Sequence, residues 1–176
     1  YVAINTLVKQ AALTDTLTID QLARAIRPTI GLTTRQTQTT FRYYEKLREA
    51  GLSHQKALER QATYAAKIHR RRARTIARTE TAYAYNYGMD ATVKQYASEG
   101  LLPVMVKRWY TARNERVCKA CGPLHGEIVP MGSPFSIGKE LPPLHPNCRC
   151  HVQYLEEKYL TPEQQRRYAK QPQAAT

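Results

Sequence analysis

The C-terminal third of the chain contains two short turns that each offer two metal ligands. Cys118 and Cys121 are separated by two residues, and His145 and Cys148 repeat this spacing. Each pair has the form of a zinc knuckle, a tight turn that brings two ligands onto one ion while backbone N–H groups point at the first sulfur. Two knuckles supply the four ligands of a tetrahedral Zn²⁺ shell. We therefore expect one structural Zn²⁺ per chain, with no open coordination position for catalysis.

Cys150 competes with Cys148 for the fourth place in this shell. If Cys150 begins a strand, its thiol points away from that of Cys148, so only one of the two reaches the metal. The knuckle spacing favours Cys148 and leaves Cys150 as the alternate ligand. The competing interpretation is four free or disulfide-bonded thiols. His125 and His151 are further donors, which we expect at the surface rather than on the metal.

The segment between the two turns needs such a cross-link. Residues 122–144 contain five prolines and four glycines and show little periodic pattern. A loop of this composition cannot bury enough apolar surface to order itself. Because a metal site forms only in the folded state, metal binding would add directly to the folding free energy.

The charge of the chain predicts a polyanionic partner. Its 27 Lys and Arg residues outnumber its 14 Asp and Glu residues, which gives a net charge of +13 and a pI of about 9.8. On a helical wheel, one face without acidic residues gathers six of these cations: Arg60, Lys67, Arg70, Arg71, Arg74 and Arg78. This face suits sequence-independent contacts with DNA phosphates. The alternatives are an acidic protein surface and a face that meets only solvent.

The first hundred residues are predicted to be helical. Apolar residues recur with helical spacing over residues 19–26, where Pro28 ends the helix. Thr33 or Thr34 can cap a second helix that stops at Gly51. From Ser53 to residue 98 there is no proline, so this stretch is one long helix or two stacked helices, with residues 79–81 and Gly88 as break points.

The face of this long helix opposite the cations is predicted to be core. Its members are Leu58, Ala62, Ala65, His69, Ala73, Ile76, Tyr83 and Tyr87. Arg72 and Glu80 lie on or beside this face, and a buried unpaired charge is costly. Each therefore needs a partner. For Glu80 we expect an arginine from the C-terminal part, either Arg113 or Arg149.

The chain changes character near residue 100, since nine of its ten prolines follow that point. Residues 104–111 alternate as a strand does, with 127–130 as a hairpin partner and 150–155 as a third strand. A polar segment follows, with a helix start at Thr161 and a disordered end over 171–176. The fold class is therefore α+β. We expect a helical region with a long helix over residues 1–100, a small zinc-stapled antiparallel β/loop region over 101–155, and a polar C-terminal helix and tail over 156–176.

An enzyme is the weaker interpretation of the cysteine and histidine cluster. HNH-type nucleases need a histidine beside an acidic residue or a second histidine, and no such pair occurs in the sequence. No Gly-rich phosphate loop or nucleophile motif is present either. No run of about 18 apolar residues exists, which excludes a membrane-spanning helix from the prediction.

An ordered set of short motifs runs through the second half of the chain: residues 76–81 with Asn86, residues 107–109, 116–121 and 124–126, Phe135, and residues 142–150. This set resembles that of the phage head morphogenesis family named after protein F of bacteriophage Mu. The last of these, Pro-Pro-Leu-His-Pro-Asn-Cys-Arg-Cys, is the most specific. The similarity covers roughly residues 70–155, and the helical residues 15–70 resemble the segment that precedes them in the family.

The resemblance implies a minor capsid protein of a tailed phage that is not an enzyme. Such proteins act in head assembly, lie inside the capsid near the portal, and are made in the host cytoplasm. The expected partners are the portal protein, other capsid-interior or scaffolding proteins, and double-stranded DNA bound non-specifically during packaging or delivery. The alternative is a zinc-containing phage nuclease or a delivered effector. Since the first residue is Tyr1, we expect the chain to be a fragment or a processed product.

Overall fold

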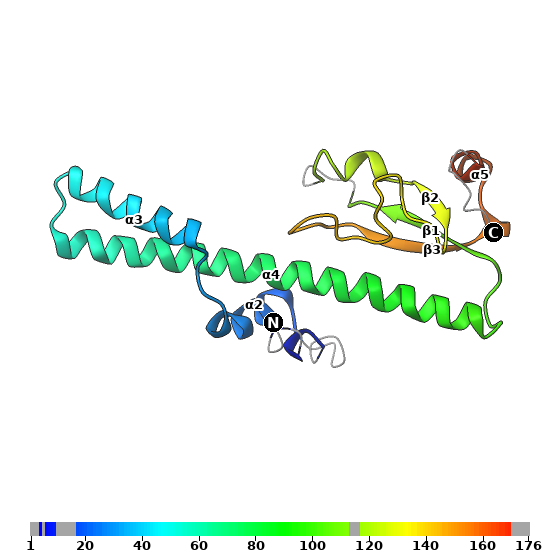
Figure 1. Ribbon diagram of the computed structural model, residues 1–176, viewed down its shortest axis with the longest axis horizontal. Helices are drawn as coiled ribbons and strands as arrows, with labels where there is room; N and C mark the ends of the chain where they lie inside the picture. The colour runs from blue at the N-terminus through cyan, green and yellow to red at the C-terminus, as the bar shows by residue number, and fades with distance from the viewer. Residues whose placement is uncertain (1–3, 5, 10–16, 113–116, 170–176) are drawn as a thin grey trace. The chain divides into compact units, whose positions relative to one another are not determined.

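The computed structural model describes residues 4, 6–9, 17–112 and 117–169. Their backbone contacts group the chain into two units, residues 1–78 and 79–176, with the boundary inside one long helix. The first unit is helical, and the second combines the end of that helix with a small antiparallel sheet (Figure 1). The predicted α+β class is confirmed. The finer division at residues 100 and 155 stays a prediction.

Capping boxes begin two helices of the first unit. Helix α2 (Ile19–Ile26) begins with a capping box between Thr18 and Gln21, and its buried face carries Leu22 and Ile26. A 3₁₀ turn η1 (Arg27–Thr29), with Pro28 near its start, ends it as predicted. Helix α3 (Thr34–Glu49) begins with a second capping box, formed by Thr33 and Gln36.

Helix α4 (His54–Ser98) is one continuous helix of 45 residues. The structure thus decides between the two predicted alternatives, and neither residues 79–81 nor Gly88 interrupts it. Gly51, at φ +84°, turns the chain before it, and Gly100, at φ +72°, turns the chain after it. In the first unit α3 lies alongside the start of α4, where Tyr43 packs on Tyr64 with 4.6 Å between ring centroids (Figure 1).

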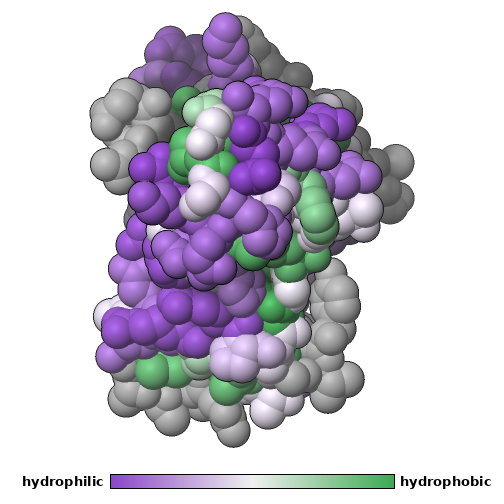
Figure 2. All heavy atoms as spheres, turned by 90° about the vertical axis from the view of Figure 1, so that its left-hand side faces the viewer, coloured by the Kyte–Doolittle hydropathy of each residue, from purple (hydrophilic) through white to green (hydrophobic). Residues whose placement is uncertain are grey.

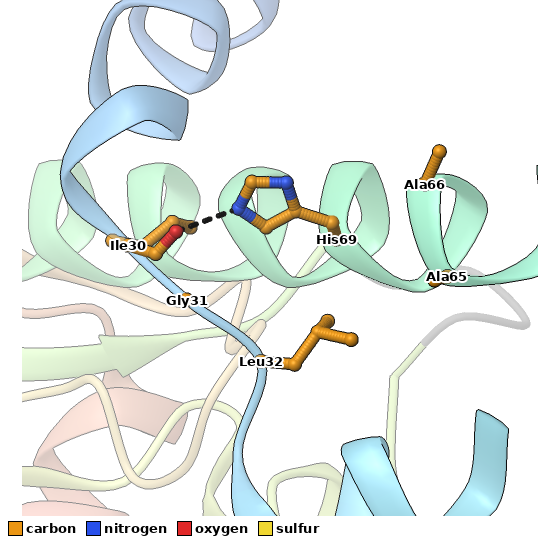
Figure 3. Close-up of a pocket in the computed structure, with 6 residues that line it drawn as sticks. All are labelled: Ile30, Gly31, Leu32, Ala65, Ala66 and His69. Atoms are coloured by element: carbon orange, nitrogen blue, oxygen red, sulfur yellow. Dashed lines mark hydrogen bonds between the residues drawn. The ribbon is translucent and has the colours of Figure 1, made fainter. Parts of the chain in front are cut away.

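A segment of extended chain after η1 also lies against α4. The Nε2–H group of His69 donates a hydrogen bond of 2.7 Å to the backbone carbonyl of Ile30, and Ile30 and Leu32 line the small hollow beside it (Figure 3). His69 therefore holds the segment after η1 against α4.

The end of this unit that faces the viewer in Figure 2 is mainly hydrophilic, with apolar residues in small separate patches.

The predicted core face of α4 is wrong in part. Ala73 is buried and Ala65, His69 and Ile76 are half-buried, but the other four are exposed: Leu58, Ala62, Tyr83 and Tyr87. In the second unit, the buried positions of α4 are instead Asn86, Asp90 and Val93. Different elements pack against α4 in the two units, so no single stripe stays buried over 30 residues.

The partners expected for the two charged residues on α4 are also not found. Within the described residues Glu80 makes no ion pair with Arg149, which is exposed, and Arg113 lies outside the described residues. Glu80 is only half-buried, so water can solvate its carboxylate. Arg72 is also half-buried, and its Nε atom is buried without a hydrogen-bond partner.

The second unit contains three antiparallel strands in the order β2-β1-β3. They are β1 (Met105–Tyr110), β2 (Ile128–Pro130) and β3 (His151–Glu156), close to the predicted ranges. One face of the sheet carries Lys107 and Trp109 together with their cross-strand neighbours on β3. The other face packs Val106 and Ile128 against Leu160 near helix α5 (Pro162–Ala169), and residues 171–176 lie outside the described residues.

Hydrogen bonds to side chains of α4 position the sheet. The side-chain oxygen of buried Asn86 accepts a bond of 2.9 Å from the backbone N–H of Val152. One turn further, the Tyr154 hydroxyl donates to the Asp90 carboxylate at 3.0 Å. Both contacts fix β3, the strand that follows the cysteines at 148 and 150.

None of the described helices combines the length and the apolar character that a membrane span requires.

Replacing Asn86 by Ala should destabilise the second unit. The variant leaves the buried N–H of Val152 without its acceptor, which costs about 1–3 kcal/mol. Urea unfolding would measure this loss, with Gln95→Ala, an exposed change on the same helix, as the control. Equal unfolding midpoints for Asn86→Ala and wild type would show that the bond contributes nothing.

A substitution of Lys107 offers a second test of the packing. Lys107 is fully buried, and its Nζ has no hydrogen-bond partner among the described residues. Burial lowers the pKa of this ammonium group from its usual value of 10.5. Between the folded-state pKa and 10.5 the unfolded chain binds more protons, so the stability of the wild type should rise with pH in that window. Lys107→Met should add about 1–3 kcal/mol at neutral pH and remove that rise. Exposed Lys139→Met is the control; a variant that melts below wild type would contradict the interpretation.

Candidate metal centre

The first ligand turn follows β1 in the chain and is closed by its own backbone. The N–H groups of Cys121 and Gly122 both donate to the carbonyl of Cys118, at 3.1 and 3.0 Å. The N–H of Cys121 also lies 3.4 Å from the Cys118 sulfur. This is the N–H···S contact expected of a knuckle. It brings the two thiols to the same side of the turn.

The second ligand turn is built around His145 and precedes β3. The N–H of Cys148 donates to the His145 carbonyl at 3.1 Å, and Asn147 adopts a left-handed backbone with φ of 63°. The Asn147 N–H donates to the Thr79 hydroxyl at 3.1 Å, which ties this turn to α4. Asparagine tolerates this conformation better than most residues.

The imidazole of His145 is oriented as a metal ligand requires. Its Nδ1 lies 2.8 Å from the carbonyl oxygen of Pro146. Because a carbonyl can only accept, Nδ1 carries the proton and Nε2 keeps its lone pair. An outer contact of this kind fixes the tautomer of a ligating histidine. Nε2 is the atom that faces the two thiols of the first turn.

Four donor atoms from the two turns converge. The Nε2 atom of His145 lies 3.0 Å from the sulfur of Cys118 and 3.3 Å from that of Cys121, and the sulfurs of Cys121 and Cys148 are 3.8 Å apart. Ligand bonds of about 2.3 Å to sulfur and about 2.0 Å to nitrogen place tetrahedral donors about 3.5–3.8 Å apart. The S–S distance matches this spacing, the two N–S distances are shorter, and Cys148 does not lie within 4.8 Å of both Cys118 and His145. The types of donor therefore suit a thiolate and imidazole metal site, although the four atoms are not all at tetrahedral spacing.

Cys150 belongs to the same cluster, which corrects one expectation. The sulfurs of Cys121, Cys148 and Cys150 all lie within 4.8 Å of one another, as do the donor atoms of Cys118, Cys121 and His145. The expectation that the thiols of Cys148 and Cys150 point apart is wrong. Both residues precede β3, which begins at His151, and residues two positions apart would share one face even in a strand. Two overlapping groups that could hold a metal thus share Cys121.

Hydrogen bonding distinguishes the two C-terminal thiols. A hydrogen bond from the Cys150 side chain lowers the pKa of Cys148 to about 4, although burial opposes the shift. The same contact, together with burial, raises the pKa of Cys150. Burial raises the pKa of Cys121 to about 12. This hydrogen bond thus favours the thiolate form of Cys148 and the protonated form of Cys150.

A small apolar core surrounds the cluster. Cys121, Cys148 and Cys150 are buried with Trp109 and Phe135, whose rings meet edge to face at 5.0 Å. The other two histidines of the region lie elsewhere. His125 accepts from the Thr111 N–H at 3.1 Å, and His151 packs on Tyr110 at 4.9 Å between ring centroids. Neither belongs to the two donor groups found among the described residues.

The six predicted DNA-contacting residues all lie on α4 in the first unit. Five of them are exposed and Arg78 is half-buried. Among them, Arg74 forms a two-pronged ion pair with Asp20 of α2, with both N–O distances at 2.7 Å. The helical wheel could not show this contact, since Asp20 lies 54 positions earlier in the chain.

Comparison with known proteins identifies a family. A family model described as phage Mu protein F like protein matches residues 3–153, which is most of the chain and includes every residue of the donor cluster. No curated protein and no solved structure matches.

Serine variants of the two C-terminal cysteines should separate their roles. Cys148→Ser removes a sulfur of the second turn that faces Cys121 of the first turn, so we expect the zinc content per chain to fall well below one. Cys150→Ser should keep about one zinc per chain. Elemental analysis of purified protein measures both, and chelation of the wild type should melt the C-terminal structure cooperatively. Metal-free wild type with an unchanged melting curve would refute a structural metal.

Proposed function

The chain belongs to the phage Mu protein F like family, and from this membership we propose that it is a minor capsid protein of a tailed phage, located inside the head near the portal. Its proposed role is assembly of the head and packaging or delivery of DNA. Its proposed partners are the portal protein, other capsid-interior or scaffolding proteins, and double-stranded DNA. The match over residues 3–153 is the observation that carries this proposal.

The donor cluster supports a structural role for the metal and a protein without enzymatic activity. We assign Zn²⁺ to Cys118, Cys121, His145 and Cys148, because thiolate and imidazole donors suit that ion. Four protein ligands leave no position for a water or a substrate. The metal would fix residues 122–144 between the two turns and add folding free energy.

The distribution of charge supports DNA as a partner of the first unit. Residues 1–78 contain fifteen Lys and Arg against five Asp and Glu, whereas residues 79–176 contain twelve against nine. Most of the net positive charge therefore lies in the helical unit. Along α4 the exposed Arg60, Lys67, Arg70 and Arg71 make no ion pair with any described residue. Such cations bind phosphates without reading base sequence.

Removal of two of these cations should weaken DNA binding and its salt dependence. For Arg60→Gln/Lys67→Gln we expect the negative slope of log K against log salt to become shallower by about 2, since each phosphate contact contributes about 0.9 to its magnitude. Fluorescence anisotropy with random-sequence duplexes at rising salt measures this slope.

The control for this experiment is Lys139→Gln/Arg166→Gln, which removes the same charge from exposed positions of the second unit. A slope that falls equally in both variants would assign the effect to net charge alone. Wild type that binds no duplex at low salt would remove DNA from the proposed partners, while the family assignment would stand.

A further inference from the structure

A pocket between α2 and α4 gathers five arginines. Its volume is about 490 Å³, and both helices contribute charged side chains to its lining: Arg24, Arg27, Arg70, Arg71, Arg74 and Asp20. All six belong to the first unit. Helix α2 lies beside this part of α4 (Figure 1). Arg24 of α2 and Arg27 of η1 are new to the predicted DNA-binding set, because both precede α4 in the chain by some thirty residues.

The pocket is short of negative charge. Its only carboxylate among the described lining residues is Asp20, and both oxygens of Asp20 are bonded to Arg74. The hydrogen bond from Arg74 lowers the pKa of Asp20, so this carboxylate stays ionised at neutral pH. The pair leaves the other four guanidinium groups without a counter-ion among the described residues. Like charges gathered in this way repel one another unless an anion enters.

One of the four also lacks a hydrogen-bond acceptor. The Nε atom of Arg27 is buried and has no partner within the described structure. Native proteins rarely leave a buried donor unsatisfied, and such a group calls for an explanation such as an absent ion. Arg27 is also one of the lining residues of the pocket, where an anion would supply the missing charge.

The lining also indicates which anion. Guanidinium groups match phosphate oxygens with two parallel hydrogen bonds, and several of them suit a polyanion better than a single carboxylate. No aromatic side chain lines the pocket, so it offers nothing on which a base could stack. A volume of about 490 Å³ lies within the usual range of small-ligand pockets and exceeds the needs of one small ion.

We propose that this pocket binds consecutive phosphates of a nucleic-acid backbone, with Arg24 of α2, Arg27 of η1 and Arg70 and Arg71 of α4 as the contacting residues. The proposal rests on the proposed DNA contact and deepens it, because it replaces a one-sided helical face by a two-helix clamp. Asp20 competes with the phosphates for Arg74. Its replacement by Asn should therefore strengthen binding, which is the opposite sign to the arginine variants.

Salt-dependent anisotropy with a random 20-base-pair duplex tests the clamp. Arg24→Gln/Arg27→Gln should make the negative slope of log K against log salt shallower by about 2. Asp20→Asn should tighten binding several-fold at the same salt and still fold, because the amide oxygen keeps one bond to Arg74. The control is again Lys139→Gln/Arg166→Gln, and circular dichroism confirms that each variant is helical.

The outcomes separate this clamp from the wider DNA contact. If Arg24→Gln/Arg27→Gln behaves as the charge-matched control while Arg60→Gln/Lys67→Gln loses affinity, the clamp is wrong and the DNA contact stands. A second arm uses inorganic pyrophosphate, and a third uses polyglutamate, as competitors of the duplex. Competition by polyglutamate as effective as that by pyrophosphate would overturn phosphate selectivity. Pyrophosphate binding without any duplex binding would overturn a nucleic-acid occupant.

Discussion

The convergence of two distant turns onto one point is the constraint on which the second unit depends. The sulfur of Cys121 lies 3.3 Å from Nε2 of His145 and 3.8 Å from the sulfur of Cys148, although 24 and 27 residues separate them along the chain. Between the turns the chain has only the three-residue strand β2 and one 3₁₀ turn as regular structure. Few ladder hydrogen bonds can therefore hold this segment, and a shared ligand set closes the loop at its two ends.

The position of the cluster is set by α4 as much as by the turns themselves. Thr79 holds the backbone of the His145 turn, and Asn86 and Asp90 hold β3. These three residues are spaced at seven and four positions, so they share one side of the helix. A helix that is polar on its buried side thus fits the sheet by hydrogen bonds. Lys107 is buried in the same region without a described hydrogen-bond partner, and its Nζ lies over the Phe135 ring, 5.6 Å from the centroid.

Local patterns in the sequence predicted the elements well. The apolar spacing before Pro28 predicted α2, the capping threonine predicted α3, and the alternation of residues 104–111 predicted β1, because each of these signals acts within a few residues. The ligand turns were found for the same reason, since their spacing is local. What failed depends on tertiary neighbours. The buried side of α4, the surroundings of Glu80 and the place of Cys150 are fixed by which elements pack there, and no periodicity records that.

The same distinction applies to the basic residues. A helical wheel groups Arg70, Arg71 and Arg74 by their positions on α4, but it treats their charges as equal. The ion pair with Asp20 removes Arg74 from the free cations, and α2 brings Arg24 and Arg27 to the remaining ones. Charges that face one another across a pocket create a stronger local potential than charges spread along a helix in water. The capacity of the first unit to bind a polyanion therefore depends on the packing of α2, which the buried Leu22 and Ile26 secure.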